Sequence, residues 1–208
     1  MSRPRELLSR LDLVEESVSL PARTLSILRP RSAEALLDEE AFEHEEFLPY
    51  WAELWASGEA LARAVGERDV AGRRVVELGC GLALPSLAAA LGGAQVLATD
   101  WSADAIELAS ENARRNALEL ETAVVRWSEP EPLLERAPWD LVLAADVLYE
   151  RRNVDELLAL LPQLSTEVLL AEPGRPHAKT FLGRAAGTWR IEQAGIVYEL
   201  TATGTSTR

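Results

Sequence analysis

The stretch Val75–Trp101 constrains the fold of this chain more than any other segment. Two apolar runs with strand character, Arg74–Leu78 and Gln95–Thr99, flank a glycine-containing turn and a short helical run rich in alanine and leucine. A strand, tight turn, helix and strand in this order predict that the two strands lie parallel in one sheet. The stretch therefore predicts an α/β domain.

The turn after the first strand reads Glu77-Leu-Gly79-Cys-Gly81, and the acidic residue Asp100 ends the second strand. Glycines where a strand turns into a helix let the backbone approach a ligand closely. An acid at the end of the next strand can accept hydrogen bonds from both hydroxyls of a ribose. We infer a nucleoside-type cofactor that lies across the carboxyl ends of the strands.

The residues around the glycines indicate which cofactor fits. The dinucleotide-binding pattern G-x-G-x-x-G lacks its last glycine here, because Leu84 stands at that position. Glu77, two residues before the first glycine, is unfavourable beside a phosphate group. S-adenosylmethionine carries an ammonium, a sulfonium and no phosphate, so the pattern favours this cofactor over NAD. An NAD(P) oxidoreductase is disfavoured for the same reason.

Composition excludes several other partners and sites. The net charge is −13 and the sequence pI is near 4.7, which disfavours a nucleic-acid substrate because its phosphates would be repelled. A single cysteine excludes an internal disulfide and a cysteine-based zinc site, and we expect no metal centre. The sequence has no apolar run long enough to span a bilayer, and its charged N-terminus lacks an apolar signal core. We expect a cytoplasmic protein with no nucleic-acid or membrane partner, and we favour a monomer.

Residues 1–48 are expected to form an extension before the main domain. Apolar residues at helical spacing predict a short amphipathic helix over residues 6–18, and a brief strand is expected at Arg23–Leu28. Ser32–Phe47 is predicted to be a helix with a cluster of acidic residues. That cluster is either a solvated helix face or a docking surface for a basic protein segment.

Residues 49–208 are expected to form the main domain. From Tyr50, a helix or a turn leading into one would place Trp51 and Trp55 on one face. Further helices are expected at Ser102–Leu118, Val154–Leu164 and Ala178–Ala186. Further strands are expected at Thr122–Trp127, Asp140–Ala145, Glu167–Ala171, Trp189–Gln193 and Ile196–Thr201. The last two strands are separated by Ala-Gly and predict a closing hairpin.

Several of these segments together resemble a known family. Over about residues 49–150 the chain resembles the class I (seven-stranded) S-adenosylmethionine-dependent methyltransferases. The segments that carry this resemblance are PYWAELWASGEALA, VVELGCGLALPSLAAA, VLATDWS, the Trp127 loop and DLVLAADVLYE. More narrowly, the chain is similar to the lysine methyltransferases of electron-transfer-flavoprotein β-subunit, valosin-containing protein and calmodulin, and to their bacterial relatives. This resemblance implies a Rossmann-like, doubly wound seven-stranded sheet, mostly parallel with an antiparallel C-terminal hairpin, and S-adenosylmethionine as cofactor.

The resemblance also implies roles for the glycine turn. Gly79 and Gly81 would form the turn beneath the cofactor, and Asp100 would take the ribose hydroxyls. Glu77 would support either that turn or the amino end of the methionine moiety. One residue departs from the family pattern, because relatives commonly keep a third glycine where this chain has Ala83. The added methyl group would crowd the turn.

Other residues would enclose the rest of the cofactor, by the same resemblance. Trp101 would flank the adenine, and Trp127 and Ser128 would border it after the third strand. Ala145 would contact the cofactor through its backbone where the fourth strand ends. Trp55 would cover the cofactor from the N-terminal side, with packing at the sheet edge as the alternative.

Asp146 and Tyr149 are the candidate catalytic residues. A carboxylate where the fourth strand opens onto the cofactor can hold an incoming ammonium and orient the amine after deprotonation; the alternative is an N-cap of the next helix. Tyr149 would stack on an alkyl chain or donate a hydrogen bond, with simple packing as the alternative. We expect an N-methyltransferase acting on a lysine-bearing, possibly basic, protein. A small-molecule N-methyltransferase and a non-catalytic S-adenosylmethionine-binding module remain the alternatives.

Overall fold

The structure is a computed structural model that describes residues 11–36 and 49–204. Its main sheet contains the strands β3 (Arg74–Leu78), β4 (Gln95–Asp100), β5 (Glu121–Val124), β6 (Leu141–Ala145), β7 (Glu167–Ala171), β8 (Trp189–Ala194) and β9 (Val197–Ala202). Their order across the sheet is β5-β4-β3-β6-β7-β9-β8. The first five strands in this order are parallel, whereas β9 runs antiparallel to both of its neighbours. The predicted sheet and its C-terminal hairpin are therefore confirmed.

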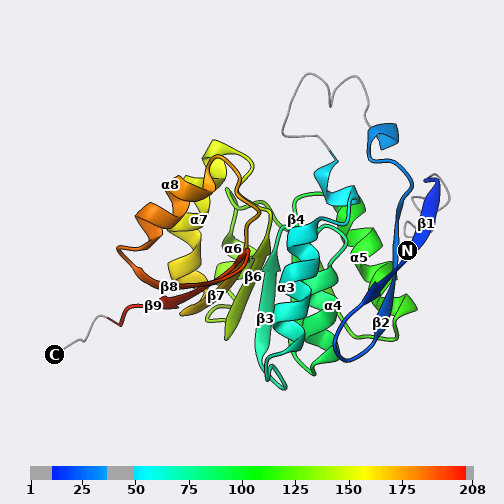
Figure 1. The fold of residues 1–208 in the computed structure, drawn as a ribbon, viewed down its shortest axis with the longest axis horizontal. Helices are drawn as coiled ribbons and strands as arrows, with labels where there is room; N and C mark the ends of the chain where they lie inside the picture. Colours follow the sequence, from blue (N-terminus) through cyan, green and yellow to red (C-terminus); the bar gives the residue numbers. More distant parts are fainter. Residues whose placement is uncertain (1–10, 37–48, 205–208) are drawn as a thin grey trace.

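Helices cover both faces of this sheet. One face carries α3 (Ala56–Gly66), α4 (Leu84–Leu91) and α5 (Ala103–Arg115), and the other carries α6 (Glu131–Leu134), α7 (Arg151–Leu164) and α8 (Ala178–Ala185) (Figure 1). Within the residues that the structure describes, no helix has the length and apolar character needed to cross a membrane. The arrangement is the doubly wound fold that the sequence predicts.

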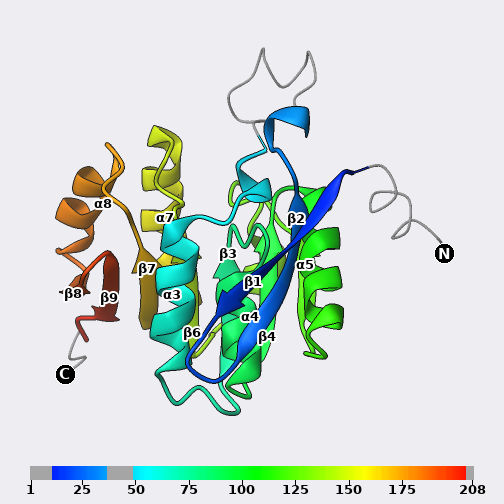
Figure 2. The same cartoon turned by 45° about the vertical axis from the view of Figure 1, so that its right-hand side comes forward.

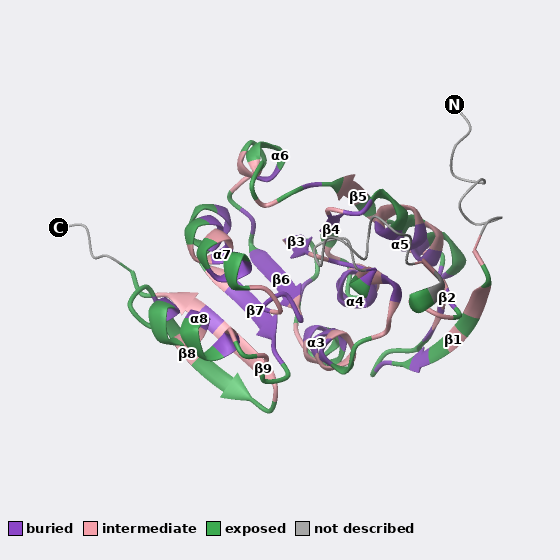
Figure 3. Ribbon diagram, turned by 90° about the horizontal axis from the view of Figure 1, so that it is seen from above, coloured by how far each residue is buried: buried purple, intermediate pink, exposed green. Residues whose placement is uncertain are grey.

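The central strands are buried on both faces, as Figure 3 shows for β6 and β7. Side chains alternate between the two faces of a strand, so one strand contributes to two cores. In β6, Leu141 and Leu143 join the core under α3 and α4, whereas Val142 and Ala144 join the core under α7 and α8. This double burial explains why β6 is apolar at every position.

The chain reverses its winding direction at β3, and this reversal positions the site. From β3 the chain passes to β4 on one side, and later returns through β6 on the other side. Ligands of open α/β sheets bind at the carboxyl ends of the strands beside such a switch point. Leu78 at the end of β3 pairs with Thr99 of β4 and Ala144 of β6, so Asp100 and Asp146 follow on either side of it.

The N-terminal region differs from its prediction. Residues 11–18 of the expected helix are not helical, since β1 (Leu13–Ser19) pairs antiparallel with β2 (Thr24–Pro30) in a separate hairpin. Residues 6–10 lie outside the described residues. Strand pairing prevails here because Val18 in β1 and the alternate residues Leu25 and Ile27 in β2 are buried beside α3 and α4. The strand predicted at Arg23–Leu28 is confirmed as β2.

Two asparagines, Asn112 in α5 and Asn116 at its C-cap, bind the free edge of β2 as a further strand would. The side-chain amide of Asn116 accepts from Ser26 N–H (3.0 Å) and donates to Ser26 O (2.7 Å). The amide of Asn112, one turn earlier, makes the same two bonds with Leu28, at 2.7 and 3.2 Å. The hairpin is thereby attached along α5, beside which it lies in Figure 2.

The structure describes only the two ends of the segment between the hairpin and α3. The structure describes a short 3-10 turn, η1 (Glu34–Leu36), and most of the predicted helix with its acidic cluster lies outside the described residues. The division of the chain after residue 48 falls beside that segment and stays a prediction. Trp51 lies in a second 3-10 turn, η3 (Tyr50–Ala52), while Trp55 is the N-cap of α3. The prediction of one shared helix face is wrong, because the extended backbone of Glu53 (φ −108°, ψ 148°) separates the two tryptophans.

Candidate active site

The turn after β3 is built from residues with left-handed backbone. Gly79 and Gly81 have φ values of 67° and 50°, a conformation that costs little only for glycine. A Cβ atom on Gly81 would lie 3.0 Å from the carbonyl oxygen of Trp51. Ala83, the N-cap of α4, is also left-handed (φ 63°) and is fully buried. The expected crowding at Ala83 therefore takes the form of backbone strain, of about 1–2 kcal/mol for a residue with a Cβ.

Glu77 fastens this turn to the start of α4. Its Oε2 accepts hydrogen bonds from the backbone N–H of Ser86, at 2.9 Å, and from the Ser86 hydroxyl. The carboxyl group is 1% exposed, and this burial raises its pKa to about 8 despite the hydrogen bonds from Ser86. These contacts match the first of the two roles considered for Glu77, that of supporting the turn.

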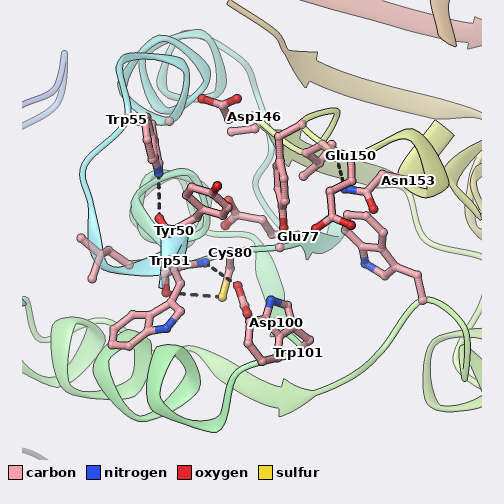
Figure 4. Close-up of a pocket in the computed structure, with 18 of the residues that line it drawn as sticks. Tyr50, Trp51, Trp55, Glu77, Cys80, Asp100, Trp101, Asp146, Glu150 and Asn153 are labelled. Atoms are coloured by element: carbon pink, nitrogen blue, oxygen red, sulfur yellow. Dashed lines mark hydrogen bonds between the residues drawn. The ribbon is translucent and has the colours of Figure 1, made fainter. Parts of the chain in front are cut away.

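Asp100 binds the same turn from the end of β4. Its Oδ2 accepts from Gly81 N–H at 2.9 Å (Figure 4), and its Oδ1 accepts from Ser102 N–H at 3.0 Å. Burial raises the pKa of this carboxyl group, and the backbone hydrogen bonds oppose that rise. The two carboxylate oxygens together offer about four lone-pair directions, so acceptor capacity remains for a ligand in the pocket beside the backbone hydrogen bonds.

Aromatic side chains line the pocket above the turn. Trp101 follows β4, with the Arg126 guanidinium 5.9 Å from the centre of its ring, and Trp127 lies in the loop after β5. On the N-terminal side, the Trp55 indole N–H donates to the carbonyl of Tyr50 at 2.8 Å. The cavity between them measures about 350 Å³, a size that suits a small-molecule ligand.

Asp146 directly follows β6 and has a left-handed backbone (φ 57°) and an almost fully buried side chain. The Arg175 guanidinium donates to both of its oxygens, from Nε to Oδ1 at 2.7 Å and from Nη2 to Oδ2 at 3.1 Å. The Ser57 hydroxyl of α3 also donates to Oδ2, at 3.2 Å. The alternative role of Asp146 as an N-cap is wrong, because Glu150 occupies the N-cap position of α7.

Tyr149 faces the same end of the pocket. Its ring centre lies 5.1 Å from that of Tyr50, at an interplanar angle of 56°. Burial raises the pKa of its phenol well above the usual value of 10, so the group stays neutral and can donate a hydrogen bond at any physiological pH. The ring centre of Tyr50 in turn lies 6.4 Å from that of Trp55, so the three aromatic side chains form a continuous rim.

The structure brings every predicted site residue to one pocket. All eleven predicted site residues are among those that line it: Trp55, Glu77, Gly79, Gly81, Asp100, Trp101, Trp127, Ser128, Ala145, Asp146 and Tyr149. Arg175 and Tyr50 line it too, although the sequence assigned neither a binding role. The partnership of Arg175 with Asp146 depends on the pairing of β6 with β7, which places their carboxyl ends side by side.

Comparison with known proteins shows the family to which the chain belongs. The sequence pattern of one family, described as lysine methyltransferase, matches residues 46–184. The chain belongs to the lysine methyltransferase family. A family member from Xenopus laevis, the electron transfer flavoprotein beta subunit lysine methyltransferase, is 35% identical over 136 residues, which cover 61% of this chain and 53% of that protein. The chain thus spans about half the length of this curated relative.

Other similar proteins show how widely this architecture is used. A histone-arginine methyltransferase of Xenopus laevis is 31% identical over 162 residues. The aligned part covers 74% of this chain and 66% of that protein. A 16S rRNA methyltransferase (RsmC) of T. thermophilus, solved with AdoMet and guanosine, superposes with a TM-score of 0.65 at 16% identity. That superposition covers 91% of this chain and 50% of the other, and shows a shared fold.

Proposed function

We propose that this chain is an S-adenosylmethionine-dependent N-methyltransferase that methylates a lysine side chain of a protein. The observation that carries the proposal is the single pocket in which the glycine turn, Asp100 and Asp146 meet at the switch point of the sheet. Membership of the lysine methyltransferase family and the curated relatives support the acceptor. The proposed domain comprises residues 49–208, with residues 1–48 as an extension.

The residues of the pocket fit this cofactor. The left-handed turn presents glycine backbone and a buried acid, with no basic side chain between Glu77 and Pro85 to pair with a phosphate. The lone pairs of Asp100 serve the ribose hydroxyls, and the tryptophans flank the adenine. The proposed contacts come from Trp55, Glu77, Gly79, Gly81, Asp100, Trp101, Trp127, Ser128 and Ala145. The bound cofactor supplies an electrophilic methyl group.

The chain's own residues have to hold and align the acceptor. The carboxylate of Asp146 provides a negative charge at the end of the pocket, where it holds the cationic amine before that amine loses its proton. The neutral Tyr149 phenol donates a hydrogen bond to the acceptor or packs against its alkyl chain. Alignment of the nucleophile with the methyl carbon is the main contribution that a protein makes to such a displacement.

A protein arginine is the second candidate acceptor. Asp146 already holds a guanidinium through two of its N–H groups, and one similar protein is a histone-arginine methyltransferase. A small-molecule amine remains an alternative acceptor, and a binding module without activity remains the alternative of another class.

The composition of the chain supports proposals about its partners and its location. The net charge of −13 disfavours nucleic acid as a partner and favours a basic protein segment. A single cysteine, Cys80, suits a reducing compartment, so the cytoplasm is the proposed location. We propose a monomer with no membrane partner and no metal.

One experiment tests the activity and the acceptor together. The chain is incubated with S-adenosylmethionine labelled in its methyl group and with separated proteome and metabolite fractions of the source organism. The proposal expects label on a protein, recovered as methyl-lysine after hydrolysis. Methyl-arginine would support the second candidate, and label on a small molecule would support a small-molecule enzyme. An intact cofactor pocket without any labelled product would favour the binding module.

A further inference from the structure

The carboxylate of Asp146 and the indole of Trp55 together form a cation site. The two bonds from Arg175 to Asp146 join the edge of a guanidinium to a carboxylate whose side chain is 7% exposed. The Cζ atom of the same guanidinium lies 5.3 Å from the centre of the Trp55 ring. A carboxylate at the edge and an aromatic ring at the face are the two contacts by which proteins hold organic cations.

The backbone that carries Arg175 is fixed without help from its side chain. Glu172, at the end of β7, is 2% exposed, and its Oε1 accepts from the N–H groups of both Gly174 and Arg175. Gly174 has φ 103°, which favours glycine at this bend. The Arg175 side chain is 34% exposed, so it can rotate into solvent while the loop keeps its shape. The guanidinium is therefore a removable occupant of the cation site.

We propose that Arg175 fills the acceptor's own cation site, and that the acceptor binds by displacing its guanidinium from Asp146 and Trp55. This inference rests on the proposed function, in which the incoming side chain is the methyl acceptor. Displacement by a neutral group would leave the buried carboxylate of Asp146 without a counter-charge, which is strongly unfavourable. Arg175 is thus a specificity-determining residue that restricts this position to cationic side chains.

Internal occupancy has a measurable consequence for affinity. A site that binds a ligand only when it is open shows an affinity reduced by the fraction of time for which it is open. If Arg175 fills the site nine-tenths of the time, an external cation binds about tenfold more weakly than it would to the open site.

The test uses n-butylammonium and methylguanidinium as probes of the full-length chain. Their dissociation constants are measured by calorimetry for wild type, Arg175→Ala and the double variant Arg175→Ala/Asp146→Asn. We expect both probes to bind Arg175→Ala about tenfold more tightly than wild type, and to lose this gain in the double variant. Arg184→Ala is the matched control, because Arg184 of α8 forms an exposed ion pair with Asp155 of α7 and neither residue lines the pocket, and this variant should bind the probes as wild type does.

Equal probe affinity in wild type and Arg175→Ala would overturn the proposal, since no competition would then exist. Weaker binding in Arg175→Ala would also overturn it, because Arg175 would then build the site instead of filling it. Arg175→Gln keeps a hydrogen-bond donor for Asp146 without the charge, and it is read in the same way if the alanine variant does not fold. Binding of S-adenosylhomocysteine is measured in parallel. Its absence would contradict the proposed function, whereas its presence without a gain in probe affinity would contradict only this inference.

Discussion

Glu77 gives the folded chain a pH dependence that one substitution can isolate. Burial raises the pKa of its carboxyl from 4.5 to about 8, so between these values the folded chain keeps a proton that the unfolded chain has released. Below the window both states are protonated, and above it both are ionised. Stability therefore decreases as the pH rises through the window, by at most roughly 1.4 kcal/mol per pH unit.

Glu77→Gln should remove this contribution, because glutamine is neutral and keeps an acceptor oxygen for Ser86. Urea unfolding of wild type and variant near pH 5 and near pH 8 measures the effect. We expect the stability of the variant relative to wild type to be greater at the higher pH. A difference between the two proteins that does not change with pH would show that Glu77 is already ionised in the folded chain.

Asp146→Asn tests whether the charge at the end of β6 serves the acceptor. Asparagine tolerates the left-handed backbone of this position, so the fold should be kept. Turnover on a responsive substrate should fall by about 100-fold, since the amide no longer attracts a cationic amine. Affinity for S-adenosylhomocysteine, measured by calorimetry, should stay close to that of wild type. Unchanged turnover would remove Asp146 from the chemistry.

At the scale of elements, the hairpin β1–β2 depends on α5 for its edge contacts. Asn116→Ala would leave the N–H and carbonyl of Ser26 without their partners, at a cost of about 2 kcal/mol. Urea unfolding measures this cost, and faster hydrogen exchange at the Ser26 amide should accompany it. Ser110→Ala on the exposed face of α5 is the control and should change stability by less than about 0.5 kcal/mol. Equal effects of the two substitutions would mean that the asparagine contacts do not stabilise the hairpin.

The sheet could be predicted from the sequence because its strands carry their own signals. β6 is apolar throughout, β3 and β4 surround a glycine turn, and Ala-Gly separates the last two strands. The hairpin β1–β2 lacked such a signal. The leucines and valine of residues 7–14 fit helical spacing equally well, and only the contacts with α5 and the core favour a strand.

The site could be predicted where a residue ends a strand, as Asp100 does, or follows one directly, as Asp146 does. Parallel strands bring their carboxyl ends to one edge, so the sequence alone indicates that such residues meet. The contact of Arg175 with Asp146 could not be predicted in this way. It depends on the bend at Gly174 and on the hydrogen bonds of Glu172, and neither has a recognisable spacing in the sequence.

At the scale of the whole molecule, the net charge of −13 should act on any basic partner. Acidic side chains outnumber the arginines among the residues that line the pocket, so its charge adds to the attraction of a cationic peptide. Fluorescence anisotropy should show that a labelled lysine-rich peptide binds more weakly as salt increases, because exposed charges are screened. An acidic peptide of the same length is the control and should not bind. Binding that is independent of salt would show that charge does not guide this encounter.

The central claim is that a nucleoside without a phosphate, S-adenosylmethionine or its product S-adenosylhomocysteine, fits between the glycine turn and Asp100. Its most direct test is the thermal unfolding midpoint of the chain with S-adenosylhomocysteine and, separately, with NAD. A ligand at 100 times its dissociation constant stabilises the folded state by about 2.7 kcal/mol, which is several degrees for a domain of this size. We predict such a rise with S-adenosylhomocysteine and none with NAD. A midpoint that NAD raises and S-adenosylhomocysteine leaves unchanged would contradict the account.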